Sequence, residues 1–279
     1  PPASWRPRKD LNYYWPQARG RPELPGRSPY VGPKDLSKGF RWKWTHPNGP
    51  QNQIITSSPV IDDQKNLYQT TINSIHKFSP DGEILWQHEL PARCNYIPCL
   101  ADGKILFTLV DGSLVALWME DGNIAWIKKL AESTGFEISS VTALDGIALA
   151  PVVTSPYYHT AVAKLVAVNV EDGEPLWEFT PDRAFWNILP SFTGEGTIVL
   201  DTANGDVYHL RLKDGGVLWK VLRDSSSWHD GGHLLGSNGV VYAVHAEQSR
   251  GGQVHQLQES DISAYRLSDG ALIWRHKYP

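Results

Sequence analysis

His229 and His233 are the side chains whose types and spacing point most directly to metal binding. They lie four residues apart, a spacing that places two imidazoles on one face of an α-helix. The intervening segment ends in Gly231-Gly232, however, and two consecutive glycines disfavour a helix. The sequence therefore favours a loop that carries two polar histidines, and we predict no metal site.

Cys94 and Cys99 are the only cysteines, and they allow two interpretations. Four intervening residues in an extended strand would hold the thiols too far apart to bond, which favours two buried thiols. A tight loop between them would instead permit a disulfide, so the redox compartment stays open. The GxSxG, HExxH, Walker and Cys-x-x-Cys motifs are absent, and we predict no catalytic residues and no cofactor.

Composition and charge describe a globular chain with an unusual N-terminal part. The 279 residues are 41% apolar with a net charge of −4, and no window of 18 consecutive apolar residues predicts a membrane span. The chain begins Pro1-Pro2, so we expect that a leader was removed or that the true N-terminus lies upstream. Residues 1–39 carry eight Lys/Arg and three Asp/Glu, whereas the remainder carries 18 and 27. An acidic main part argues against nucleic acid as a partner.

A repeat organises most of the chain, because Asp-Gly followed four residues later by Trp occurs five times. The five copies are Asp81-Gly82 with Trp86, Asp121-Gly122 with Trp126, Asp172-Gly173 with Trp177, Asp214-Gly215 with Trp219, and Asp269-Gly270 with Trp274. Asp-Gly between apolar runs is a strong hairpin signal, since glycine supplies the positive φ of a tight turn. Three strand-like runs precede each turn, for example Ile198–Leu200 and Val207–Leu210 in the fourth copy. Four strands per repeat of 40 to 55 residues predict an all-β propeller of four-stranded blades, the strands named A to D along the chain.

This repeat resembles that of the pyrroloquinoline-quinone (PQQ) family, which includes quinoprotein dehydrogenases and assembly factors of the BamB type. The family's pattern has an alanine before the turn, matched here by Ala116, Ala167 and Ala264, and the glycine and tryptophan of all five copies. The resemblance covers residues 40–279 and implies that each repeat tryptophan docks between neighbouring blades. The dehydrogenases of the family resemble one another in an adjacent cysteine pair against the quinone and a bound Ca²⁺. This chain lacks that pair, so a PQQ-dependent dehydrogenase is its least favoured interpretation.

The blade count predicts an incomplete ring. Five blades are recognisable, and Phe40–Trp44 reads as a lone D strand in front of them. The chain ends just after the fifth D strand, so we expect either further sequence after Pro279 or an open ring whose edge a partner covers.

The D–A and B–C loops of a propeller share one face, and aromatic residues and arginine gather in these loops. The two long repeats place their extra residues in B–C loops, at 154–160 and 247–260. Tyr157 and Tyr158 are predicted partner contacts. Further candidates on this face, at the mouth of the central channel, are Tyr96, Arg183, Trp186, Asn187, Trp228, His229 and Asp230. Trp186 and Trp228 are equally compatible with filling the central channel.

Residues 1–39 form an extended, basic arm with eight prolines, which cannot build a core of its own. The arm nevertheless carries aromatic side chains that a pure linker does not need. We predict that it anchors to a neighbouring subunit through Trp5, Arg8, Tyr13, Tyr14 and Trp15.

The sequence thus predicts two domains, the arm at 1–39 and the propeller at 40–279. Its favoured function is a non-catalytic scaffold that binds other protein subunits through the arm and the loop face. The alternative is a propeller that senses a ligand or peptide at the channel mouth. The family resemblance favours a non-cytosolic compartment, such as the periplasm, a secretory lumen or an organelle lumen like that of the thylakoid. A position peripheral to a membrane complex fits this interpretation.

Overall fold

The computed structural model describes residues 13–22, 26, 34–35, 37, 39–47, 55, 57–94, 96–134, 140–154, 162–183, 185, 188–223, 232–248 and 257–278. These residues form 20 β-strands and no α-helix. None of their segments is a helix that is long and apolar enough to cross a membrane.

The strands form five antiparallel sheets of four, each one blade with its strands A to D in chain order. Blade 1 comprises β1 (Val60–Ile61), β2 (Leu67–Thr70), β3 (Ser74–Phe78) and β4 (Ile84–Glu89). Blade 2 comprises β5 (Cys99–Ala101), β6 (Lys104–Thr108), β7 (Ser113–Trp118) and β8 (Ile124–Lys129). Blade 3 comprises β9 (Thr142–Leu144), β10 (Ile147–Val153), β11 (Ala163–Asn169) and β12 (Pro175–Phe179). Blade 4 comprises β13 (Ser191–Phe192), β14 (Thr197–Asp201), β15 (Val207–Arg211) and β16 (Val217–Val221). Blade 5 comprises β17 (His233–Gly236), β18 (Val240–Gln248), β19 (Leu257–Arg266) and β20 (Leu272–Tyr278).

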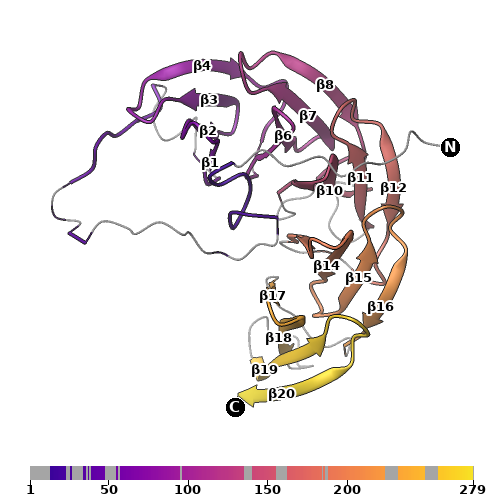
Figure 1. Ribbon diagram of the computed structural model, residues 1–279. Helices are drawn as coiled ribbons and strands as arrows, with labels where there is room; N and C mark the ends of the chain where they lie inside the picture. The colour runs from indigo at the N-terminus through magenta and orange to yellow at the C-terminus, as the bar shows by residue number, and fades with distance from the viewer. Residues whose placement is uncertain are drawn as a thin grey trace.

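The five blades follow one another along an open arc, with the D strands β4, β8, β12, β16 and β20 on its outer side (Figure 1). Apolar clusters fill the seams between blades rather than one central core. Between blades 3 and 4, for example, Leu149 and Leu165 belong to one cluster with Phe192 and Leu210. The predicted propeller of four-stranded blades is confirmed, and the 154–160 insertion lies between β10 and β11, as predicted.

Four of the five repeat tryptophans join successive blades, as the family pattern implies. Their indole nitrogens donate to a carbonyl oxygen of the next blade, Trp86 to Met119 (3.2 Å), Trp126 to Val170 (3.1 Å), Trp177 to Leu212 (2.8 Å) and Trp219 to Leu267 (2.7 Å). Each ring also lies against the turn glycine of that blade, Gly122, Gly173, Gly215 and Gly270. The alanines of the motif stand directly opposite a tryptophan across the C–D pair, at Ala116–Trp126, Ala167–Trp177 and Ala264–Trp274. A small residue there leaves room for the indole.

The tryptophans at the two ends of the arc differ in their contacts. Trp42, in the lead-in segment, donates its indole N–H to the Pro80 carbonyl at 3.1 Å, and its ring lies against Gly82. The D-strand tryptophans of blades 1 to 4 make the same two contacts with the blade that follows them. Phe40–Trp44 thus docks like a D strand, although the structure assigns it no strand pairing. Trp274 of blade 5 is 45% exposed, whereas Trp126 is 9% exposed.

Alanine at Gly173 is expected to destabilise the propeller far more than alanine at Gly239. Both glycines have a left-handed φ, 74° and 72°, which costs other residues about 1–2 kcal/mol. A Cβ at Gly173 would meet the Trp126 ring at 2.6 Å, whereas one at Gly239 meets nothing within 4 Å. Gly173→Ala should therefore add a further ~1–3 kcal/mol of overpacking. Urea unfolding of the two variants measures this difference, and equal losses would rule out the proposed contact with the indole.

Candidate functional site

Three connections of blade 4 converge on the face where D–A and B–C loops emerge. They are the D–A loops at 180–190 and 222–232 and the short B–C turn at 202–206. Arg183, Arg223 and Asp206 come from these three segments, and their charged side chains add to the apolar packing of Phe185 and Ile188 beneath this face.

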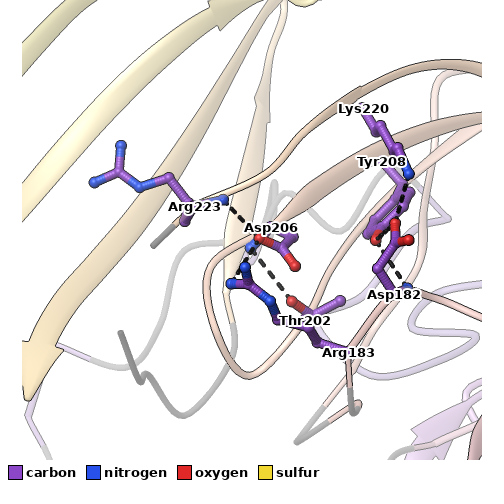
Figure 2. Close-up of polar contacts among 7 residues, drawn as sticks. All are labelled: Asp182, Arg183, Thr202, Asp206, Tyr208, Lys220 and Arg223. Carbon is purple, nitrogen blue, oxygen red and sulfur yellow. Dashed lines mark hydrogen bonds and ion pairs between the residues drawn. The ribbon is translucent and has the colours of Figure 1, made fainter. Parts of the chain in front are cut away.

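Asp206 organises the centre of this face, and its side chain is fully buried. Its Oδ1 accepts the backbone N–H of Arg223 at 2.7 Å and the Arg183 guanidinium at 3.3 Å (Figure 2). One carboxylate thus fixes the loop that enters blade 4 and the loop that leaves it. In Figure 2 the Arg223 guanidinium points away from Asp206.

The Arg223 guanidinium binds Asp261 of blade 5. This ion pair crosses the seam between blades 4 and 5, as the pair of Arg183 with Asp206 does between blades 3 and 4. Arg223 Nη2 lies 2.5 Å from Asp261 Oδ2, and both side chains are almost completely buried. Burial opposes ionisation of Asp261, but hydrogen bonding from Ser263 and the charges of Arg223 and His245 outweigh it and lower the pKa of the carboxyl. Asp206 and Asp261 occupy the same repeat position, three residues before the C-strand residue opposite the tryptophan. An alignment of the repeats by that residue would have found both acids.

A more exposed cluster borders this face (Figure 2). Asp182 Oδ2 accepts the Tyr208 hydroxyl at 2.7 Å and the Lys220 ammonium at 2.7 Å. Lys220 and Tyr208 lower the pKa of Asp182, whereas burial and the bond to Asp182 raise the pKa of Tyr208. Such an ion pair orders the loop surface but contributes little to stability.

Ser191, His233 and Asp201 form a hydrogen-bonded row across the seam between blades 4 and 5. His233 Nε2 lies 2.8 Å from Ser191 Oγ, and His233 Nδ1 lies 2.8 Å from Asp201 Oδ1. This is the order of groups that activates a serine for acyl transfer. Ser191 is completely buried, however, so a substrate carbonyl has no approach to Oγ, and the row acts as a bond between blades. His233 begins strand β17, so its interpretation as a polar loop histidine is wrong.

Residues 13–22 of the arm lie along the inner edges of four blades. These are the edges of β1, β5, β9 and β13 that face away from their B strands. Trp15 pairs with Ile61 through two backbone hydrogen bonds of 2.9 and 2.8 Å. The Pro16 and Pro22 carbonyls accept the N–H groups of Leu100 (2.7 Å) and Phe192 (3.0 Å). We call residues 13–22 the plug.

The plug corrects the prediction that this part of the arm anchors to another subunit. Tyr13 accepts the Gly103 N–H at 3.0 Å, Trp15 pairs with β1, and Tyr14 lies beside Lys65 of blade 1. Unpaired strand edges need a partner, and the chain's own arm supplies it. Trp5 and Arg8 lie outside the described residues, and their role stays a prediction.

The structure describes only some of the residues that were predicted to lie on the loop face. Arg183 lies on the face and pairs with Asp206, whereas Tyr96 is a buried residue and not an exposed contact. The Tyr96 hydroxyl accepts a hydrogen bond from the Thr134 hydroxyl at 3.4 Å, and the Tyr96 carbonyl accepts one from the Thr70 hydroxyl at 3.1 Å. The remaining candidates, Tyr157, Tyr158, Trp186, Asn187, Trp228, His229 and Asp230, lie outside the described residues.

The residues that the structure describes do not fit a quinone and calcium site. Cys94 and Cys99 are buried and are not joined by a disulfide, as the favoured interpretation of the thiols predicted, and burial raises the pKa of Cys94 to about 11. Among the described residues no group of three His, Cys, Asp or Glu side chains is placed to hold a metal ion. The plug fills the inner edges of blades 1 to 4 with polypeptide.

Comparison with known proteins gives relatives of two kinds. A curated outer membrane protein assembly factor BamB from Yersinia pestis is 26% identical over 171 residues, 58% of this chain and 42% of the relative. A putative dehydrogenase XoxF from Paracoccus denitrificans is 25% identical over 158 residues, 52% of this chain and 26% of the relative. The chain thus spans less than half the length of these relatives.

Solved structures share the fold at low identity. BamB from Moraxella catarrhalis has a TM-score of 0.54 at 12% identity, covering 80% of this chain and 76% of that one. Quinohemoprotein alcohol dehydrogenase from Comamonas testosteroni has a TM-score of 0.68 at 13% identity, covering 99% of this chain and 50% of that one. The family model described as outer membrane protein assembly factor BamB matches residues 40–150 and 127–279. With its five Trp-to-Gly blade contacts, the chain belongs to this family of PQQ-repeat β-propellers.

Proposed function

We propose that this chain is a non-catalytic propeller scaffold that holds other protein subunits in a larger assembly. Its binding surface is the D–A/B–C loop face of blades 4 and 5, where Asp206 and Asp261 fix the loops. Fixed residues such as Arg183 and Arg223 suit a binding surface, because a partner need not order them on association.

The observation that carries this proposal is the plug. Residues 13–22 fill the inner edges of blades 1 to 4 with backbone hydrogen bonds, which favours a polypeptide-binding fold over one that holds a cofactor there. The name of the BamB relatives supports a role in assembling proteins at an outer membrane, and therefore a non-cytosolic location.

Two leucines of blade 4 allow a matched test of the loop face. Leu222 and Leu218 are 48% and 43% exposed and lie four residues apart, Leu222 just beyond the loop end of β16 and Leu218 near its C–D turn. We expect Leu222→Glu to abolish co-purification of the native assembly, since a charge in a binding surface is costly to desolvate. Leu218→Glu should leave the assembly intact.

Native mass spectrometry of tagged chains from their own cells measures both results. Loss of the assembly in both variants, or in neither, would contradict the assignment to the loop face. The purified chain should also show no oxidation of alcohols with added PQQ and Ca²⁺, and turnover would overturn the non-catalytic proposal.

A further inference from the structure

The inner edges of blades 1 to 4 bind a polypeptide segment with defined chemistry. The contacts at Ile61, Leu100 and Phe192 are hydrogen bonds between backbone groups, so they depend on the path of the bound segment and not on its residue types. Two side chains of the plug add sequence dependence. Tyr13 accepts the Gly103 N–H, and Gln17 Oε1 accepts the Ala143 N–H at 3.0 Å and the Cys99 thiol at 3.5 Å.

The bound segment is a tight turn rather than a straight strand. Gln17 and Gly20 exchange two backbone hydrogen bonds, of 3.3 and 2.9 Å. Gly20 has a φ of +93°, and a Cβ at this position would lie 3.2 Å from the Trp15 ring. Gln17 and Ala18 at the tip are fully buried. The site therefore fits a segment that folds back between an aromatic residue and a glycine.

Departure of the plug would leave the strand pairing within each blade intact. Each A strand keeps its own pairing with its B strand, such as Val60–Tyr68 and Leu100–Ile105, because the plug contacts only the opposite edge. Its departure would expose five N–H groups, those of Ile61, Leu100, Gly103, Ala143 and Phe192. Exposed strand edges of this kind pair readily with another chain.

We propose that these inner edges are a docking site for a turn-forming segment of a partner protein, and that the plug occupies the site in cis until that segment displaces it. The tethered plug competes at a high effective concentration, so the partner segment must itself be tethered or bind more tightly. This site goes beyond the proposed function, because it lies apart from the exposed loop surface.

The thiols of the unmodified chain report whether the plug leaves. Cys99 donates to Gln17 of the plug, whereas Cys94 donates to the Tyr96 carbonyl at 3.7 Å and serves as the internal control. In native buffer we expect dithionitrobenzoate to label Cys99 at least ten times faster than Cys94. Labelling of both at the rate of global unfolding would overturn exchange of the plug.

A fluorescent peptide with the sequence of residues 11–24 tests binding in trans. The full chain carrying Gln17→Ala, whose own plug is weakened, should bind the unmodified peptide at least ten times tighter than the same peptide carrying Gln17→Ala. Equal affinities, no binding, or a stable dimer formed by exchange of arms between two copies would each overturn the proposal. Loss of the assembly in Leu222→Glu would still support the scaffold, so the two proposals fail separately.

Discussion

Replacement of Trp126 by alanine is expected to lower the free energy of unfolding by about 3–5 kcal/mol. Trp126 is 9% exposed, packs in the apolar cluster between blades 2 and 3, and donates its indole N–H to Val170 at 3.1 Å. The variant loses ring burial, leaves a cavity at a seam and removes the hydrogen bond to that carbonyl. Chemical denaturation followed by circular dichroism measures the loss.

Trp274→Ala is the matched control for this prediction. Trp274 holds the same repeat position opposite Ala264, as Trp126 does opposite Ala116, but it is 45% exposed. Its removal should cost below about 1 kcal/mol, as for other surface substitutions. A comparable loss in both variants would show that the tryptophan stabilises its own sheet and not the seam with the next blade.

Asp201→Ala is expected to cost about 3–5 kcal/mol, because it removes one partner from a buried polar row. Asp201 Oδ1 binds His233 Nδ1 at 2.8 Å, and Oδ2 accepts the Gly232 N–H at 2.9 Å. The side chains of Asp201 and His233 are 3% and 2% exposed, so water cannot replace the lost carboxylate. Thermal and urea unfolding should both show the loss.

Two further variants test whether the cost of Asp201→Ala comes from the buried hydrogen bonds of Asp201 with His233 and Gly232. Asp182→Ala removes an aspartate that also accepts two hydrogen bonds but is exposed, and its unfolding curve should stay close to that of the parent. In the double variant Asp201→Ala/His233→Ala, the loss should be smaller than the sum of the single losses, since neither group is then left unpaired. Additive losses would contradict a direct bond between the two residues.

The arm shows where prediction from the sequence fails. Prolines and basic residues predicted that residues 1–39 do not build a core of their own, but they did not predict that Tyr13 and Trp15 bind the chain's own blades. Composition describes what a segment cannot form by itself. It does not identify a distant surface with unpaired N–H groups, such as those of Leu100 and Phe192, which exists only after the blades have assembled.

What the sequence determined by itself is the local repeat. Asp-Gly turns require positive φ, and the alternation of apolar runs requires strands, so five four-stranded blades follow from neighbours along the chain. The tertiary structure alone decided which polar residues meet across the seams. Arg223 and Asp261 are 38 residues apart, and His233 and Asp201 are 32 apart. Their contacts depend on how one blade sits against the next, and that placement is set by tryptophan packing rather than by sequence spacing.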